Sequence, residues 1–212
     1  MITQNTRAKY LFGFCCEVKD GKFVRLDPTN TPYWPVARFR GFAAASMLGL
    51  IDEIVLFGHH DEPELGAKVI ENYASRPQFA HLRQQTKISF VYTEETTKGN
   101  AVDMESYRRQ RSIDPDDILR MTSDYHRKRA ERFAFESGHE VHFEASEDAL
   151  HLLCKTKAEH THLREVLRRY YTPATDPGAY ARRCTNEDCG VGEVNTRSYV
   201  PLAKQPKKTQ VA

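Results

Sequence analysis

The stretch DDILRMTSDYHRKRAERF, residues 116–133, passes from a short apolar run straight into a polar, helix-forming segment. The ILRMT part is typical of a buried strand, and the residues after it are mostly strong helix formers. Ser123 stands between the two parts, where a serine can cap a helix. We predict a strand over residues 116–122 and a helix over residues 123–138, which ends at Gly138.

The same strand-to-helix unit recurs along most of the chain. The other predicted strands cover residues 10–15, 52–58, 87–92 and 139–145, and the other predicted helices cover residues 40–50, 59–75, 96–110 and 147–171. Because Pro28, Pro32 and Pro35 interrupt residues 26–39, we expect no long helix there. Strict alternation with helical crossovers predicts an α/β fold of three layers, in which helices cover both faces of a mostly parallel sheet of about five strands.

The chain has 212 residues, enough for one such domain with its own core. We assign residues 8–171 to this domain, which ends in a C-terminal helix. From residue 172 onward glycine, proline and charged residues dominate. Residues 172–212 are therefore expected to form an irregular, partly disordered extension.

The charge and the apolar pattern argue against two classes of partner. The formal net charge is +2 at pH 7, so charge gives no reason to expect nucleic acid. No apolar run approaches the ~20 residues that a membrane span needs, and the first residues lack the apolar segment of a signal peptide. We expect a cytoplasmic protein without a membrane partner. Its five cysteines, an odd number, are then expected to be reduced.

Cys184 and Cys189 form a C-x4-C pair, and His160 and His162 lie upstream of it. Such residues could provide half of a zinc site. The spacing is loose and no second tight pair exists, so a polar loop that contains two thiols is the favoured interpretation. We predict no metal site.

Polar residues gather where the predicted strands end, which is where open parallel sheets bind ligands. The residues concerned are Gly13, Gly58, His59, Thr97, Thr122, Ser123 and His126. Several of these loops begin helices, whose free N–H groups favour an anion. Arg38 or Arg40, near the start of the first predicted helix, would add a bidentate contact to a phosphate or carboxylate.

Most of these residues also have a purely structural interpretation. Thr97 and Ser123 are candidate N-caps, and Glu64 would complete a capping box that begins at Asp61. Taken singly, the N-cap role is favoured for the two hydroxyls.

The basic run after Thr122 has its own alternatives. Arg127, Lys128, Arg129 and Arg132 suit a solvated helix face, and His59 and His60 suit a solvated loop. His126 lies one turn into its helix, where its ring can point back over the end of the strand. Its ordinary pKa near 6.5 suits acid–base chemistry and surface exposure equally well.

Four segments together resemble the YdcF/SanA/ElyC-like family. LFGFCCEVKDGKF, residues 11–23, resembles the family's first strand with a glycine-bearing turn and a D-G. TSDYHRKRAERFAFESGHEVHF, residues 122–143, resembles the family signature T-S-x-x-H-x-x-R-A, which joins a strand to a helix. IVLFGHHDEPELGAKVIENY, residues 54–73, resembles a strand, a glycine-rich loop and a helix with S-E-A. TTKGNA, residues 96–101, lies where the family has N-T-x-E-N-A. The resemblance covers roughly residues 8–146.

The matching positions in the other three segments are Thr122, Ser123, His126, Arg129, Ala130, Gly58, Glu64, Thr97, Asn100 and Ala101. Thr96 and Gly99 depart from the pattern, because the family has Asn and Glu there. The third loop therefore lacks the family's carboxylate, and an activity that needs this group would be lost. The resemblance implies a Rossmann-like fold and suggests S-adenosylmethionine as a ligand, but it implies no defined reaction.

Two function classes remain open. One is an enzyme of hydrolysis or group transfer that acts on a phosphorylated or nucleotide-like substrate. Its anion would be bound by Ser123 and Thr97 and neutralised by Arg40 and Arg129. His126 would act as acid or base, and Glu64 would orient His126 or a water. The other is a module that binds a nucleotide or S-adenosylmethionine without turnover. The chain has neither G-x-x-x-x-G-K-[ST] nor G-x-G-x-x-G. In both cases we expect Ser123, His126, Arg129, Glu64 and Asn100 to lie together.

Overall fold

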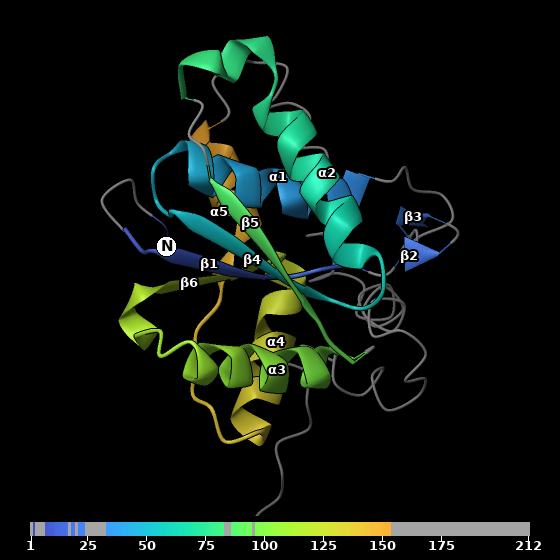
Figure 1. Cartoon of the computed structure of the whole chain (residues 1–212), viewed down its shortest axis with the longest axis vertical. Helices are drawn as coiled ribbons and strands as arrows, with labels where there is room; N and C mark the ends of the chain where they lie inside the picture. Colours follow the sequence, from blue (N-terminus) through green and yellow to red (C-terminus); the bar gives the residue numbers. More distant parts are fainter. Residues whose placement is uncertain are drawn as a thin grey trace, which may run out of the picture.

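The fold is an α/β sandwich built on a five-stranded, all-parallel sheet (Figure 1). The computed structural model describes residues 2, 7–16, 18–19, 21–23, 33–82, 86–94 and 96–153. The strands of the sheet are β1 (Tyr10–Phe14), β4 (Glu53–Gly58), β5 (Lys87–Tyr92), β6 (Ile118–Thr122) and β7 (Glu144–Ala145). The helices are α1 (Tyr33–Met47), α2 (Glu62–Ala74), α3 (Thr97–Gln110), α4 (Asp124–Glu136) and α5 (Ser146–Leu153). The predicted three-layer, Rossmann-like architecture is confirmed.

Three smaller elements complete the described part. A two-stranded antiparallel sheet pairs β2 (Val18–Lys19) with β3 (Lys22–Phe23). Short 3-10 helices cover η1 (Pro77–Leu82) and η2 (Pro115–Asp117).

The order of the strands in the sheet is β5-β4-β1-β6-β7. The chain moves outward from β1 to β4 and β5, and then returns to the opposite side of β1 to form β6 and β7. The order therefore reverses between β1 and β6, and ligands bind at such a switch point in open α/β sheets. Gly13 of β1 lies opposite Met121 of β6, so the two strands end side by side.

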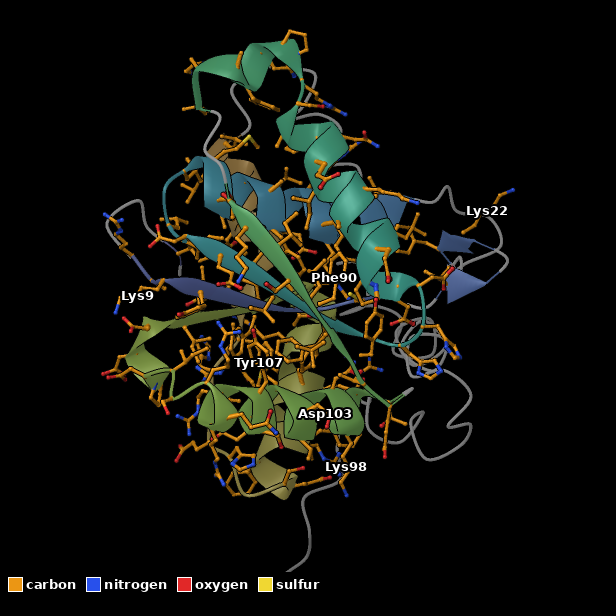
Figure 2. All side chains as sticks on the ribbon, viewed as in Figure 1. Lys9, Lys22, Phe90, Lys98, Asp103 and Tyr107 are labelled. Carbon is orange, nitrogen blue, oxygen red and sulfur yellow. The ribbon has the colours of Figure 1, made fainter. Side chains whose placement is uncertain are left out.

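Alternate residues of the central strands pack against opposite helical layers. Leu11 and Leu56 lie in the core shared with α1, α2 and α5, whereas Phe12 and Phe57 lie in the core shared with α3 and α4. Figure 1 shows these two groups of helices on opposite sides of the sheet. Tyr107 of α3 lies between its helix and the sheet (Figure 2), with its ring centroid 5.8 Å from those of Phe12 and Phe57. Because both faces are covered, the central strands are apolar nearly throughout.

Helices α1 and α5 approach each other closely in the layer that they form with α2. Gly41 of α1 has no room for a side chain, because a Cβ there would overlap the backbone carbonyl of Ser146. This glycine lets the first turn of α5 lie directly on α1. The residues that begin α5 are thereby held near the carboxyl edge of the sheet.

The structure corrects the predicted start of the first helix. The helix begins at Tyr33 and not at residue 40, so the expectation of no long helix over residues 26–39 is wrong for the second half of that range. Pro35 is the third residue of α1. Proline is tolerated in the first turn because the N–H groups there have no intrahelical partner.

The last strand is much shorter than the predicted span of residues 139–145, since only Glu144 and Ala145 pair with β6. The residues just before it are held by α4 instead. The backbone N–H of Phe143 donates to Oε1 of Glu131 at 3.0 Å, and Nδ1 of His142 lies 2.9 Å from the same oxygen. A ladder bond to β6 is replaced by a side-chain bond to the helix. The helix predicted over residues 147–171 begins at Ser146, and its described part is α5, which runs to Leu153.

Candidate functional site

Arg38 joins the ends of the two strands at the switch point. Its guanidinium is fully buried, with 0% of the residue exposed. Nε donates to Oγ of Ser123 at 2.8 Å, and Nη1 donates to the carbonyl of Cys15 at 3.0 Å. A planar guanidinium can make both bonds at once because its N–H groups point in fixed, divergent directions. Arg38 thus ties the loop after β1 to the start of α4.

Arg40, the arginine predicted to neutralise the anion, does not lie at this junction. Its guanidinium carbon is 5.4 Å from the centroid of the Tyr73 ring, so it stacks between α1 and α2. Two residues along a helix are about 200° apart, which puts Arg38 and Arg40 on nearly opposite faces of α1. Of the two arginines, Arg38 is the one that contacts Ser123.

His126 is buried beside this junction, with 2% of the residue exposed. Its Nδ1 lies 2.8 Å from Oγ1 of Thr122, and its Nε2 lies 3.2 Å from Oγ1 of Thr97. Burial lowers the pKa of His126 well below its ordinary value, and the charges of Arg129 and Arg38 lower it further. The ring is therefore neutral near pH 7. A neutral imidazole has one donor and one acceptor nitrogen, so one threonine hydroxyl accepts and the other donates.

The charge run on α4 divides into a buried residue and solvated ones. Arg129, one turn after His126, is 2% exposed, whereas Lys128 and Arg132 are exposed. The solvated-face interpretation is therefore wrong for Arg129 and right for Lys128 and Arg132. Arg129 and Arg38 both act on the His126 ring, which places two buried cations around it.

Glu147 approaches the same junction from α5, and sequence reasoning did not single it out. The residue is 3% exposed, and its Oε2 accepts from the backbone N–H of Asp124 at 3.1 Å. Oε1 is buried and has no hydrogen-bond partner among the described residues. Burial raises the pKa of Glu147 to about 7, although Arg38 and the N–H of Asp124 act in the opposite direction. A titratable carboxyl group thus lies at the N-terminus of α4.

The two predicted hydroxyl caps behave differently. Thr96, not Thr97, caps α3, because its Oγ1 accepts from the N–H of Gly99 at 2.9 Å. This leaves the Thr97 hydroxyl to contact His126. Ser123 is the N-cap of α4 by position, but its side chain makes no capping bond. Its hydroxyl accepts from Arg38 instead.

The loop after β4 adds a second carboxylate. The N–H of His59 donates to Oε2 of Glu62 at 2.8 Å, and Nδ1 of His59 lies 3.0 Å from the carbonyl of Thr93. Gly58 is required here, because a Cβ would lie 2.6 Å from Cβ of Cys15 and 2.8 Å from Oε2 of Glu62. Burial raises the pKa of the Cys15 thiol well above its ordinary value, and the charge of Glu62 raises it further. Cys15 is therefore a protonated thiol.

Glu64 and Asn100 lie toward the end of β5. The hydroxyl of Tyr92 donates to Oε1 of Glu64, and the hydroxyl of Thr93 donates to Oδ1 of Asn100. The predicted capping box is not formed, because Asp61 makes no side-chain capping bond. Glu64 is close enough to act on the Cys15 thiol. Of the expected group of five, Ser123, His126 and Arg129 lie after β6, and Glu64 and Asn100 lie near the end of β5. The Thr97 hydroxyl, in the first turn of the helix that carries Asn100, contacts His126.

Gly13 lies inside β1 and not in a loop. A Cβ on Gly13 would overlap the ring of Phe42, so this glycine admits an aromatic side chain from α1. Its observed contact is internal packing.

The described residues contain no cluster of three or more His, Cys, Asp or Glu side chains that could hold a metal ion. Cys184, Cys189, His160 and His162 lie outside the described residues. In the described ranges, no helix combines the length and apolar character that crossing a bilayer requires.

Fold and site together define a Rossmann-like α/β protein with a buried, charged cluster at the switch point of its sheet. No protein-family model, curated protein or solved structure matches the chain.

Proposed function

We propose that this chain is a YdcF-like protein that binds the phosphate-type anion of a nucleotide-like ligand at the carboxyl ends of β1 and β6. The observation that carries the proposal is the burial of four polar residues of the T-S-x-x-H-x-x-R-A block. They are Thr122, Ser123, His126 and Arg129. A helix start that served only as a cap and a solvated face would not bury a hydroxyl, an imidazole and a guanidinium together.

The chemistry around Ser123 suits an anion. Arg38 donates to its hydroxyl, and the residue lies at the N-terminus of α4, where backbone N–H groups and the helix dipole favour negative charge. Arg129 adds a second buried cation nearby.

Binding without turnover is the function that these contacts favour. A general acid or base works best with a pKa near the operating pH, whereas the pKa of His126 is held well below its ordinary value. Both ring nitrogens also face threonine hydroxyls. His126 therefore serves to position Thr97 and Thr122 in this proposal.

Hydrolysis or group transfer is the second candidate, and Glu147 is the observation that favours it. A buried carboxyl group with a pKa of about 7 is suited to proton transfer at neutral pH. S-adenosylmethionine is an alternative ligand, because its carboxylate could take the place of a phosphate at Arg38 and Ser123. We also propose that the protein is cytoplasmic and has no nucleic-acid partner, as its sequence leads us to expect.

A thermal-shift panel tests the proposed function. The panel contains inorganic phosphate, nucleotides, sugar phosphates and S-adenosylmethionine, each at several concentrations. A ligand present at about a hundred times its Kd raises the free energy of unfolding by about 2.7 kcal/mol. We expect a phosphate-bearing ligand to raise Tm, and Ser123→Ala to weaken its binding about tenfold.

Ser106→Ala is the matched control, because Ser106 is exposed on α3 and donates to a carbonyl of its own helix. It should leave the shift unchanged. Turnover that His126→Ala or Glu147→Gln abolishes while binding persists would favour the enzyme. A panel without any stabilising anion would remove the proposal.

A further inference from the structure

Glu147 occupies a position that an anionic ligand would be expected to use. Its carboxylate accepts the N–H of Asp124, which is the first residue of α4. Backbone N–H groups at this end of a helix are the usual partners of a bound anion. The protein thus already holds a carboxylate of its own at the N-terminus of α4.

The same carboxylate shares its charged partner with the proposed ligand. Arg38 lowers the pKa of Glu147 through its charge, and Arg38 also donates to Ser123, the residue that precedes Asp124. An anion bound at Arg38 and Ser123 would therefore lie beside Glu147. Two negative charges so close together in a buried site repel strongly.

Protonation of the carboxylate removes this repulsion. Oε1 of Glu147 is buried and accepts no hydrogen bond from the described residues, so it is the atom that can take up a proton without breaking an existing bond. The resulting O–H would be a buried hydrogen-bond donor that a neighbouring anion could use. Oε2 can keep its bond from Asp124 throughout.

The geometry points to proton-coupled binding at this site: an anion enters the junction of Arg38 and Ser123 together with one proton, which is transferred from solvent to Oε1 of Glu147. This inference rests on the proposed function and adds a preference among anionic ligands to it. The site prefers ligands whose anionic group arrives with a proton, or whose own hydroxyl or amino hydrogen can be donated to Glu147.

The charges around Glu147 are consistent with this coupling. Burial raises its pKa to about 7, the Asp124 carboxylate acts in the same direction, and Arg38 acts against it. The pKa of the adjacent Asp148 is raised by the charge of Glu144 and lowered by that of Arg127. An added anion can only raise the pKa of Glu147 further. Above pH 7 the free protein is mainly ionised at this residue, so the complex must take up a proton and affinity must fall as pH rises.

Sulfate is the probe for the test, because it is a tetrahedral dianion that does not titrate over about pH 6 to 9, the window in which Glu147 changes charge. Its Kd is measured by calorimetry across this window for the wild-type chain, Glu147→Gln and Glu71→Gln. Glu71 is exposed on α2 and serves as the matched control. Proton uptake is measured on the wild-type chain at pH 8 in two buffers of different ionisation enthalpy.

We expect the wild-type Kd to rise by up to about tenfold per pH unit above pH 7, with uptake approaching about one proton. Glu147→Gln should bind sulfate with little pH dependence and more tightly than the wild type at pH 8.5, and Glu71→Gln should follow the wild type. Binding without proton uptake, or a pH dependence that persists in Glu147→Gln, overturns the inference and leaves the anion site standing. If neither sulfate nor inorganic phosphate binds at any pH, the anion site itself fails and the inference with it. The two-buffer measurement decides the matter even if Glu147→Gln does not fold.

Discussion

Nε of Arg38 donates to the hydroxyl of Ser123 across 2.8 Å, and this bond joins two residues 85 positions apart. Arg38 belongs to α1, and Ser123 occupies the N-cap position of α4, the helix that follows β6. In addition to the backbone ladder between β1 and β6, one buried guanidinium therefore bridges the two halves of the sheet, at the point where the strand order reverses.

Replacing Arg38 by lysine should be costly although the charge is kept. A lysine ammonium is a point charge and cannot reach Ser123 and the Cys15 carbonyl in the same divergent geometry. We expect the free energy of unfolding to fall by about 3 kcal/mol, as measured by urea denaturation. Arg40→Lys is the control, because its ring contact with Tyr73 contributes only about 0.5–1 kcal/mol. Equal losses in both variants would contradict the role assigned to Arg38.

The His126 ring should carry no charge at pH 7. Its folded-state pKa lies below the value of 6.5 that applies to the unfolded chain, so the unfolded state binds the proton first as pH falls. The stability that His126 contributes is present above about pH 6.5 and is lost at lower pH. Nitrogen NMR of the imidazole should show a single neutral tautomer at pH 7. A doubly protonated ring at pH 7 would contradict the arrangement.

The fold was predictable because local and long-range signals agree along most of the chain. Apolar runs alternate with helix formers, and alternation with helical crossovers allows few sheet topologies. The boundaries at Tyr33 and Glu144 were not predictable. A proline such as Pro35 is compatible with a first turn as well as with a loop. The shortening of β7 depends on the bond from Phe143 to Glu131, which only the packed structure reveals.

The candidate site was predictable where it follows from the ends of strands, as for Ser123 and His126. The choice between Arg38 and Arg40 depends on the rotation of α1 about its axis, and the prolines before it concealed where that helix begins. Glu147 follows the last strand, so the same rule would have included it. An acidic residue in the first turn of a helix is usually solvated and complements the helix dipole. The sequence does not show that α5 packs on α1 and that this packing buries Glu147.

Glu147 should make the protein less stable as pH rises. Its folded-state pKa of about 7 lies above the unfolded value of 4.5, so the folded state binds the proton more tightly. The associated stability is complete below about pH 4.5 and is lost as pH rises through 7, with a total of about 3 kcal/mol. Glu147→Gln should remove this slope, measured as the difference in unfolding free energy between variant and wild type from pH 5 to 8. Glu71→Gln should leave the slope in place, and a slope that survives in Glu147→Gln would contradict the assignment.

Gly41→Ala separates helix propensity from packing between α1 and α5. In an unobstructed helix interior, alanine in place of glycine stabilises by about 1 kcal/mol. At Gly41 the added Cβ meets the backbone carbonyl of Ser146, which cannot rotate away as a side chain would. We therefore expect the opposite sign, a loss of about 2 kcal/mol in the free energy of unfolding. Because Ser146 precedes Glu147, the displaced helix should also expose that carboxyl group and shift its pKa back toward 4.5, which NMR titration of the side-chain carbon would report. A more stable Gly41→Ala variant would mean that α5 does not rest on α1 as described, and Glu147 would then lose its place beside Arg38.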